Sequence, residues 1–336
     1  MKVIEIDASL AKNWDQITND EKTGSFMQSI AWGEFKKSLG QKVWNLAVVD
    51  DFKNEIFAIA QVVKEELVGF GSFLYVPYGP IFKTNNKEEV LNVLLEKLKT
   101  LAQEEKAIFI RLEPKISLVN KKLKFYNTYR QIQHTLKMDL KPSEEELLAS
   151  FKQKTRYNLH LSQKKGVEIV TGEKEDLSEF ITILKSVGAR GDFFLPEDKY
   201  FYQMFDTLKP KGMVDLLLAK YRGKIIGGFI NIYFLDEATY LYGASRDDYR
   251  NLMVNYPLMW ETISRAKAHG CRRLDFRGAN PNEQDQTHPW YGFTRFKRGF
   301  APYSPVESYP GSYFLIAKSL KFYLYYAQKL IRRRPL

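Results

Sequence analysis

The first half of the chain carries a series of hydrophobic patterns that predicts a small α/β unit. Residues 43–63 hold two apolar strands around an acidic turn, which is typical of an antiparallel hairpin, and residues 73–77 predict a third strand. Apolar residues at helical spacing over 88–104 predict an amphipathic helix, and the apolar run at 107–114 predicts a buried strand. We therefore expect three strands, a helix and a fourth strand, in that order.

The same series returns in the second half. Residues 214–233 predict another hairpin, 240–244 a third strand, 256–268 a helix, and 272–277 a strand that ends in arginine and is followed by glycine. The two series are offset by about 170 residues, which is a domain length rather than the period of a solenoid repeat. The sequence thus predicts two copies of one α/β unit.

The order of these elements suggests a fold class. A hairpin, a third strand and a helix that crosses to a parallel neighbour resemble the element order of GNAT-type N-acetyltransferases. We predict an α/β (α+β) protein with two tandem GNAT-like domains, whose mixed, mainly antiparallel sheets are flanked by helices. The boundary is placed near Pro142, because Ser143 and Glu146 match a capping box at the start of a helix. A basic helix is expected over 151–166, ended by Gly166.

Composition and charge say more about the expected binding partners than about the fold. The 336 residues are 44% hydrophobic, enough for two cores, and the net charge of +11 favours anionic partners such as nucleic acid, phosphorylated small molecules or an acidic membrane surface. The single cysteine, Cys271, excludes internal disulfides and suits a reducing compartment, so we expect a cytoplasmic location and a buried thiol. Residues 1–7 resemble a strand rather than a signal peptide, and lysines interrupt the most lipid-like segment, 313–331.

Most familiar catalytic patterns are missing. The four histidines lack metal-ligand spacing, and neither half shows the glycine-rich pyrophosphate loop of coenzyme A-dependent enzymes, so we expect no metal and no cofactor. What remains is cationic: Arg277 ends a strand, and Arg295, Lys297 and Arg298 follow in an aromatic, glycine-containing segment. Such a pattern suits an anion or a developing oxyanion. Flanking aromatic residues also predict partial burial of the cluster at 190–194.

Stretches distributed along almost the whole chain resemble the Fem family of peptidoglycan bridge-forming aminoacyltransferases, also called methicillin-resistance factors. The matching stretches are FMQS at 26–29 with Trp32 and Lys36, YVPYGP at 75–80, RLEP at 111–114, KTRYN at 154–158, KKGV at 164–167, RGDF at 190–193, YLYGA at 240–244, DFRGA at 275–279 and FKRGF at 296–300. Each is weak alone, and their order along the chain makes the set specific.

The resemblance implies twin acetyltransferase-like domains, residues 1–141 with 310–336, which bind the precursor, and residues 142–309. It implies transfer of an amino acid from aminoacyl-tRNA to the stem-peptide amine of a UDP- or lipid-linked muropeptide precursor, a step of cell-wall biogenesis that supports cell shape. Long family members carry a helical-hairpin arm that resembles the tRNA-binding arm of synthetases. This chain has no room for that arm and resembles the short form.

Site residues follow from the same resemblance. Lys297 is the expected catalytic residue, with Glu113 as a less direct match beside the acceptor. The expected substrate-binding residues are Lys36, Arg190, Tyr78, Tyr242, Arg277 and Trp32. The expected tRNA-binding residues are Lys152, Lys154, Arg156, Lys164, Lys165, Arg295 and Arg298.

An aminoacyl ester is already activated, so the expected enzyme positions an amine and stabilises an oxyanion, for which the Lys297 ammonium is suited. Two alternatives stay open: an acyl-CoA-dependent N-acyltransferase, and a non-catalytic RNA- or membrane-binding protein. We expect a monomer. Residues 313–334 predict a helix on the first domain whose arginines at 332–334 contact the inner face of the cytoplasmic membrane peripherally.

Overall fold

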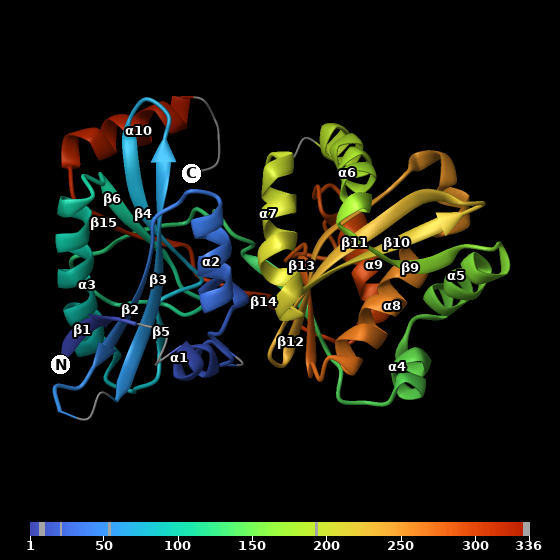
Figure 1. Ribbon diagram of the computed structural model, residues 1–336, viewed down its shortest axis with the longest axis horizontal. Coiled ribbons are helices and arrows are strands. Elements are labelled where there is room, and N and C mark those ends of the chain that lie inside the picture. The colour runs from blue at the N-terminus through green and yellow to red at the C-terminus, as the bar shows by residue number, and fades with distance from the viewer. Residues whose placement is uncertain (7–10, 21, 53–54, 192–193, 332–336) are drawn as a thin grey trace. The chain divides into compact units, whose positions relative to one another are not determined.

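The protein is described by a computed structural model (Figure 1), which divides into two compact units. The first unit comprises Met1–Gln133 together with the chain from Tyr309 onward, and the second comprises His134–Ser308. Each unit has its own sheet and its own hydrophobic core. The structure describes all residues except 7–10, 21, 53–54, 192–193 and 332–336.

The first unit is built on one mixed sheet. Its β4 and β6 run parallel, with α3 (Lys87–Glu104) connecting them through β5, and its other neighbouring strands are antiparallel. In spatial order the strands are β1 (Lys2–Glu5), β2 (Val43–Val49), β3 (Ile56–Leu67), β4 (Gly71–Pro77), β6 (Phe109–Glu113), β15 (Ser312–Ile316) and β7 (Lys124–Tyr126), with β5 (Ile81–Phe82) paired to β3.

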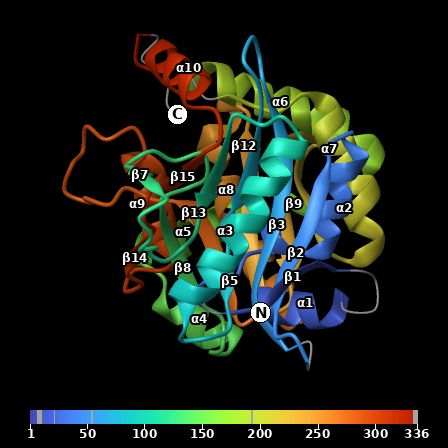
Figure 2. The ribbon, with the colours of Figure 1, turned by 90° about the vertical axis from the view of Figure 1, so that its left-hand side faces the viewer.

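Helices cover both faces of this sheet, because successive strand residues point to opposite sides. Leu46 of β2 packs in the same core as the buried leucines of α3, and Figure 2 shows α3 lying across the strands. The next residue, Ala47, packs instead with Trp14 of α1 (Ala11–Thr18). The helix α2 (Ile30–Ser38) begins at Ser29, whose hydroxyl accepts a hydrogen bond from the backbone N–H of Trp32.

The second unit repeats this plan. Its β12 and β13 run parallel, with α8 (Asn255–Ala268) as the crossover, and the other neighbours are antiparallel. In spatial order the strands are β14 (Val306–Ser308), β8 (His134–Asp139), β13 (Arg273–Gly278), β12 (Glu237–Ser245), β11 (Lys224–Phe234), β10 (Val214–Tyr221) and β9 (Glu168–Gly172). The helices are α4 (Glu144–Ser150), α5 (Gln153–Lys164), α6 (Leu177–Gly191), α7 (Asp198–Leu208), α8 and α9 (Tyr291–Phe300).

The predicted fold class is confirmed, and so are several local features. The capping box of Ser143 and Glu146 begins α4, and α5 ends before Gly166, which has a positive φ of 82°. Cys271 is buried, and burial raises the pKa of its thiol to about 12. None of the helices that the structure describes combines the length and the apolar composition that crossing a bilayer requires.

Two predicted boundaries differ from the structure. Residues 134–141 were expected in the first domain, yet β8 pairs with β13, so the second unit begins at His134 rather than at Pro142. Residues 313–316 were expected to be helical, yet they form β15, which is paired on both sides by β6 and β7. Only α10 (Ser319–Ile331) is helical in that segment. The arginines at 332–334 lie outside the described residues.

Candidate active site

The candidate site of the second unit starts at the end of β13. The pairing of β13 with β8 shifts register between Asp275 and Gly278, and Arg277 in between adopts a left-handed backbone with φ of 58°. A non-glycine residue rarely adopts that conformation, and where it occurs the surrounding contacts hold it. Here Oδ1 of Asp275 accepts hydrogen bonds from the backbone N–H of Arg277, at 2.6 Å, and from the hydroxyl of Thr135 on β8.

This bend presents two carbonyl groups to Lys297 of α9. The Lys297 Nζ donates hydrogen bonds to the carbonyl oxygens of Gly278, at 2.6 Å, and of Arg277, at 3.3 Å. The side chain is otherwise enclosed, since Lys297 is only 7% exposed. An ammonium has three donors, so these two bonds leave one N–H direction for another acceptor.

Burial controls the charge of this lysine. It lowers the pKa of Lys297 to about 7, and although the carboxylate of Asp275 raises the pKa, the guanidinium of Arg277 lowers it again. A lysine with a pKa near neutrality exchanges its proton readily at physiological pH. Lys297 is therefore an oriented hydrogen-bond donor whose charge changes near neutral pH.

Aromatic residues also lie near the Arg277 bend. The ring of Trp290 lies against Gly278, where an added Cβ would be 3.3 Å from the ring. Tyr242 of β12 stacks edge-on against Phe201 of α7, and burial raises the pKa of Tyr242, while a hydrogen bond from Tyr200 and the charge of Arg277 lower it. Of the predicted site residues, the structure thus brings together Arg277, Lys297 and Tyr242.

The helix α9, which carries Lys297, packs closely against α5 at a glycine. At Gly299 an added Cβ would overlap the Oγ1 atom of Thr155 on α5, whereas at Gly292 in the same helix nothing lies within 4 Å. The buried Thr155 therefore requires a glycine opposite it. This close contact fixes α9 against α5.

We expect Gly299→Ala to lower the free energy of unfolding by about 1–3 kcal/mol, because the added methyl group overpacks the α5–α9 contact. Gly292→Ala is the matched control and should be neutral or slightly stabilising, since alanine favours the helix. Urea unfolding followed by circular dichroism compares the two. Adding Thr155→Ala should restore much of the stability of Gly299→Ala; equal stability of the two glycine variants would contradict the overlap.

The predicted tRNA-binding cations fall into two groups. Four of them have exposed side chains that make no hydrogen bond or ion pair within the described part of the chain: Lys152, Lys154, Lys164 and Arg295. The others bind the protein itself: Arg298 donates to Glu283 and to the carbonyls of Ala301 and Ser304, Arg156 to the carbonyls of Ala149 and Phe151, and Lys165 to the carbonyl of Asn251. We interpret the second group as structural, because these contacts occupy donors that an RNA phosphate would need.

Arg190 lies at the end of α6 and pairs with Asp247. The expected burial of its surroundings is wrong where the structure describes them, because Phe194 is 95% exposed. Asp192 and Phe193 of that cluster lie outside the described residues. Arg190 is therefore a half-exposed cation in an ion pair rather than part of an aromatic pocket.

In the first unit, the predicted cation is Lys36 of α2, which lies near two aromatic rings. Its ammonium lies 5.9 Å from the ring centroid of Trp32 and 5.7 Å from that of Phe35. Burial lowers the pKa of Lys36, Glu65 raises it and Arg130 lowers it. Sequence analysis did not select Arg130, which follows no recognisable motif and reaches Glu65 with an ion pair of 2.8 Å.

Tyr78 and Glu113 are both held by contacts within the first unit. The Tyr78 hydroxyl donates to the carbonyl of Ile132 at 3.0 Å. Glu113 is 5% exposed and forms an ion pair of 2.6 Å with Nε of Arg111. Its carboxylate also accepts hydrogen bonds from Tyr75, Ser312 and the backbone N–H groups of Arg130 and Gln131. These five donors argue for a structural carboxylate rather than a general base.

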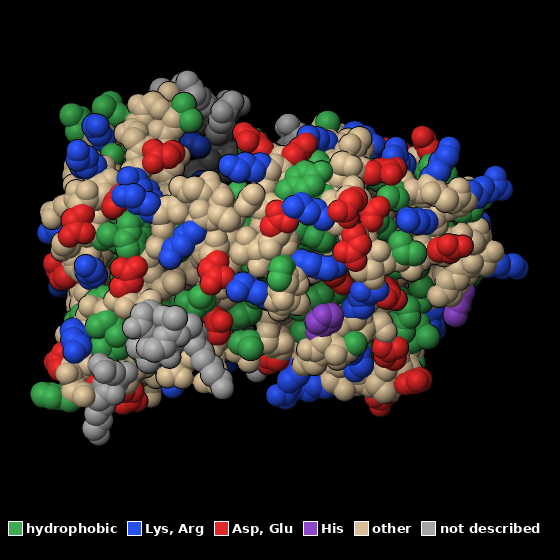
Figure 3. All heavy atoms as spheres, viewed as in Figure 1, with side chains coloured by type: hydrophobic (Ala, Val, Ile, Leu, Met, Phe, Trp, Pro, Cys, Tyr) green, Lys and Arg blue, Asp and Glu red, His purple; other side chains and the backbone are tan. Residues whose placement is uncertain are grey.

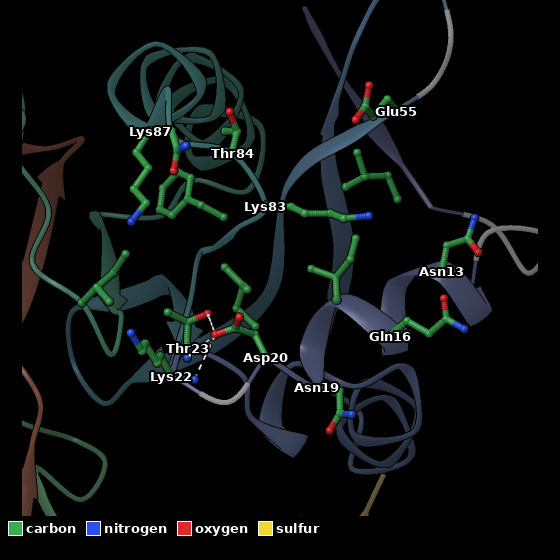
Figure 4. A pocket seen from close by; sticks show the side chains of 16 residues that line it. Asn13, Gln16, Asn19, Asp20, Lys22, Thr23, Glu55, Lys83, Thr84 and Lys87 are labelled. Atoms are coloured by element: carbon green, nitrogen blue, oxygen red, sulfur yellow. Dashed lines mark hydrogen bonds between the residues drawn. The ribbon is translucent and has the colours of Figure 1, made fainter. Parts of the chain in front are cut away.

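An open cavity of about 860 Å³ lies elsewhere in the first unit, beside the start of α3 (Figure 4). Lys22, Lys83 and Lys87 line it together with Asp20, whose carboxylate accepts the hydrogen bonds from Thr23 drawn in the figure. None of the predicted site residues lines this cavity. Among the described residues, no group of three or more His, Cys, Asp or Glu side chains is arranged to hold a metal ion.

Each unit thus has a mixed sheet with one parallel crossover, and in the second unit the buried Lys297 of α9 contacts the end of β13. The FemAB family model matches residues 10–125, 120–225 and 217–329, so the chain belongs to the FemAB family. Two relatives are named lipid II:glycine glycyltransferase. The protein of Staphylococcus epidermidis is 23% identical over 86% of this chain and 88% of its own, and that of Staphylococcus aureus MRSA252 has the same identity and coverage.

Solved structures agree on the fold. The crystal structure of FemX superposes with a TM-score of 0.80 at 21% identity, covering 96% of this chain and 99% of its own. A tandem GNAT protein from the clavulanic acid biosynthesis pathway superposes with a TM-score of 0.59 at 10% identity, covering 94% and 98%. The second match supports the sequence prediction of two GNAT-like domains.

Proposed function

We propose that this protein is an aminoacyltransferase of peptidoglycan bridge formation, acting on a lipid II-type precursor. Membership of the FemAB family and the names of the glycyltransferase relatives support the transferase activity and the acceptor. The observation that carries the chemistry is Lys297, a buried ammonium held by the carbonyls of Arg277 and Gly278. The enzyme would work in the cytoplasm on an anionic substrate, for which a net charge of +11 is suited.

The donor in this proposal is aminoacyl-tRNA. The acceptor amine attacks the ester carbonyl carbon, the carbon–oxygen bond to the ribose breaks, and the ribose oxygen takes up a proton as the amine loses one. The Lys297 ammonium stabilises the tetrahedral oxyanion, which is the kind of interaction that contributes most when the donor is pre-oriented. The ammonium is lost as the pH rises through the lysine pKa near 7, so transfer should decline over that range.

The remaining sites divide between the two substrates. Lys36, with Trp32 and Tyr78, and Arg190, with Tyr242 and Arg277, are proposed to bind the precursor. Of the tRNA candidates, the exposed Lys152, Lys154, Lys164 and Arg295 are retained, since cations with free donors can neutralise phosphates. Arg156, Lys165 and Arg298 are set aside because they bind the protein. Glu113 is set aside as a base for the same reason.

Purified protein offered a panel of charged tRNAs, with UDP-linked and lipid-linked precursor in separate reactions, tests the function. Transfer of one amino acid from tRNA to the stem peptide is expected. Transfer from acyl-CoA without tRNA would favour an N-acyltransferase. No transfer, together with salt-sensitive binding of unrelated RNAs, would favour a non-catalytic binding protein.

Peripheral membrane contact is also proposed, through the outer face of α10. The inner face of this helix buries Phe322 and Tyr325, while Leu320, Tyr323 and Leu324 are 74%, 44% and 56% exposed. The sequence from 318 to 331 contains lysines and no acidic residue. Figure 3 shows hydrophobic and cationic side chains together where α10 begins. Apolar residues flanked by cations suit an anionic lipid surface.

We expect Leu320→Gln with Leu324→Gln to weaken binding to vesicles containing phosphatidylglycerol by at least about tenfold, because two exposed leucines that would insert among the acyl chains are lost. Vesicle co-sedimentation measures the effect. The matched control is Phe52→Gln, because Phe52 is 94% exposed and precedes the first residue of β3. The other end of β3 is the one nearest α10. Equal binding by the double variant and the unchanged protein would exclude α10 as the contact.

A further inference from the structure

The bend that seats Lys297 depends on one carboxylate. Asp275 lies on β13, two residues before Arg277, and its Oδ1 atom receives both the backbone N–H of Arg277 and the hydroxyl of Thr135. Thr135 itself is 1% exposed and belongs to the neighbouring strand β8. The carboxylate thus joins the end of β13 to β8 at the point where their register shifts.

The register shift decides where the carbonyl groups point. In a regular antiparallel ladder, backbone carbonyls bond to the neighbouring strand or face away within the sheet plane. Here the left-handed Arg277 turns the chain, and the carbonyls of Arg277 and Gly278 accept from the Lys297 ammonium. A non-glycine residue is unfavourable in the left-handed state unless a contact stabilises it there. The Asp275 bond to the Arg277 N–H supplies such a contact.

The same carboxylate also acts on Lys297 through space. The charged groups that influence the lysine are Asp275 and Arg277, both on β13. On its own helix, Arg298 is paired with Glu283, and across the α5–α9 contact the neighbour is the uncharged Thr155. Asp275 is therefore the anion whose charge offsets the effect of burial on the Lys297 ammonium.

We propose that Asp275, held by Thr135, is the positioning residue of Lys297: it fixes the Arg277–Gly278 bend whose carbonyls orient the ammonium, and its negative charge acts on that ammonium. The role of Lys297 in transfer rests on the proposed function. The effect of Asp275 on the lysine itself does not.

The test is an NMR titration of lysines labelled with carbon-13 at the ε position, in full-length protein without substrate, with Lys297→Met to assign the signal. Asp275→Asn preserves the shape and an acceptor oxygen but removes the charge. We expect it to lower the pKa of Lys297 by about one unit, as loss of a nearby opposite charge does. Thr135→Val keeps the charge and should shift the pKa less. Glu168→Gln, on the exposed edge strand β9, is the matched control and should leave the pKa unchanged.

Transfer rates over pH 5.5–9 give the second reading. For Asp275→Asn, the decline of transfer with rising pH should move to lower pH by the same amount as the lysine titration. An unchanged lysine pKa, or a rate reduced by one constant factor at every pH, would overturn the inference and leave Asp275 with a merely structural role. A shifted pKa in a protein whose Lys297→Met variant still transfers would instead contradict the function proposed for Lys297.

Discussion

Lys297→Met is expected to reduce the rate of amino acid transfer by a factor of about 10²–10³, which is the usual cost of removing one donor to a developing oxyanion. Methionine has a similar length and packs well in buried sites, so α9 should keep its place. The loss should appear in kcat, because the ammonium acts on the transition state rather than on the bound precursor. Steady-state transfer assays and precursor binding by calorimetry measure the two effects separately.

Lys224→Met is the control for this experiment. Lys224 is an exposed lysine at the start of β11, so the variant removes one positive charge from the same unit without touching the β13 bend. Its kcat should match that of the unchanged protein. If Lys297→Met also transfers at a near-normal rate, Lys297 has no part in the chemistry.

Glu113→Gln is expected to cost about 3–5 kcal/mol in the free energy of unfolding, because it leaves the Arg111 guanidinium buried without its counter-charge. Arg111 and Glu113 have side chains only 4% and 6% exposed, and the ion pair between them spans 2.6 Å. The lost contacts also include those from Tyr75 and from Ser312 on β15. Urea unfolding followed by tryptophan fluorescence measures the change, and the transition of the first unit should be the one that shifts.

Glu66→Gln is the matched control, since Glu66 is an exposed carboxylate on β3 of the same unit. It should change stability by less than about 0.5 kcal/mol. At a temperature where Glu113→Gln is still folded, its transfer rate should stay near normal. A folded, stable Glu113→Gln with no transfer would restore Glu113 as a catalytic candidate.

The periodicity of hydrophobic residues was sufficient to predict the repeated α/β unit. The buried residues of α8 recur at helical spacing. The strand β11 is buried on both faces and therefore reads as a continuous, largely apolar run. The domain boundary near residue 134 and the helix predicted from residue 313 were wrong for a related reason. β8 and β15 each pair with a strand that is distant in sequence, so their state depends on partners that local pattern does not reveal.

The candidate site likewise was predicted in part from the sequence and decided in part by the tertiary structure. From the sequence alone, the local pattern and the family resemblance placed Arg277 at the end of a strand and Lys297 in an aromatic, glycine-containing segment. The structure shows that this segment is the helix α9. Only the tertiary structure decided which cations can contact a substrate. Arg298 forms an ion pair with Glu283, while the buried Lys297 donates hydrogen bonds to two carbonyl groups. Asp275 gained its importance from Thr135, 140 residues away along the chain. Ion pairing and burial depend on neighbours brought close by folding, and these decide the charge and the role of each residue.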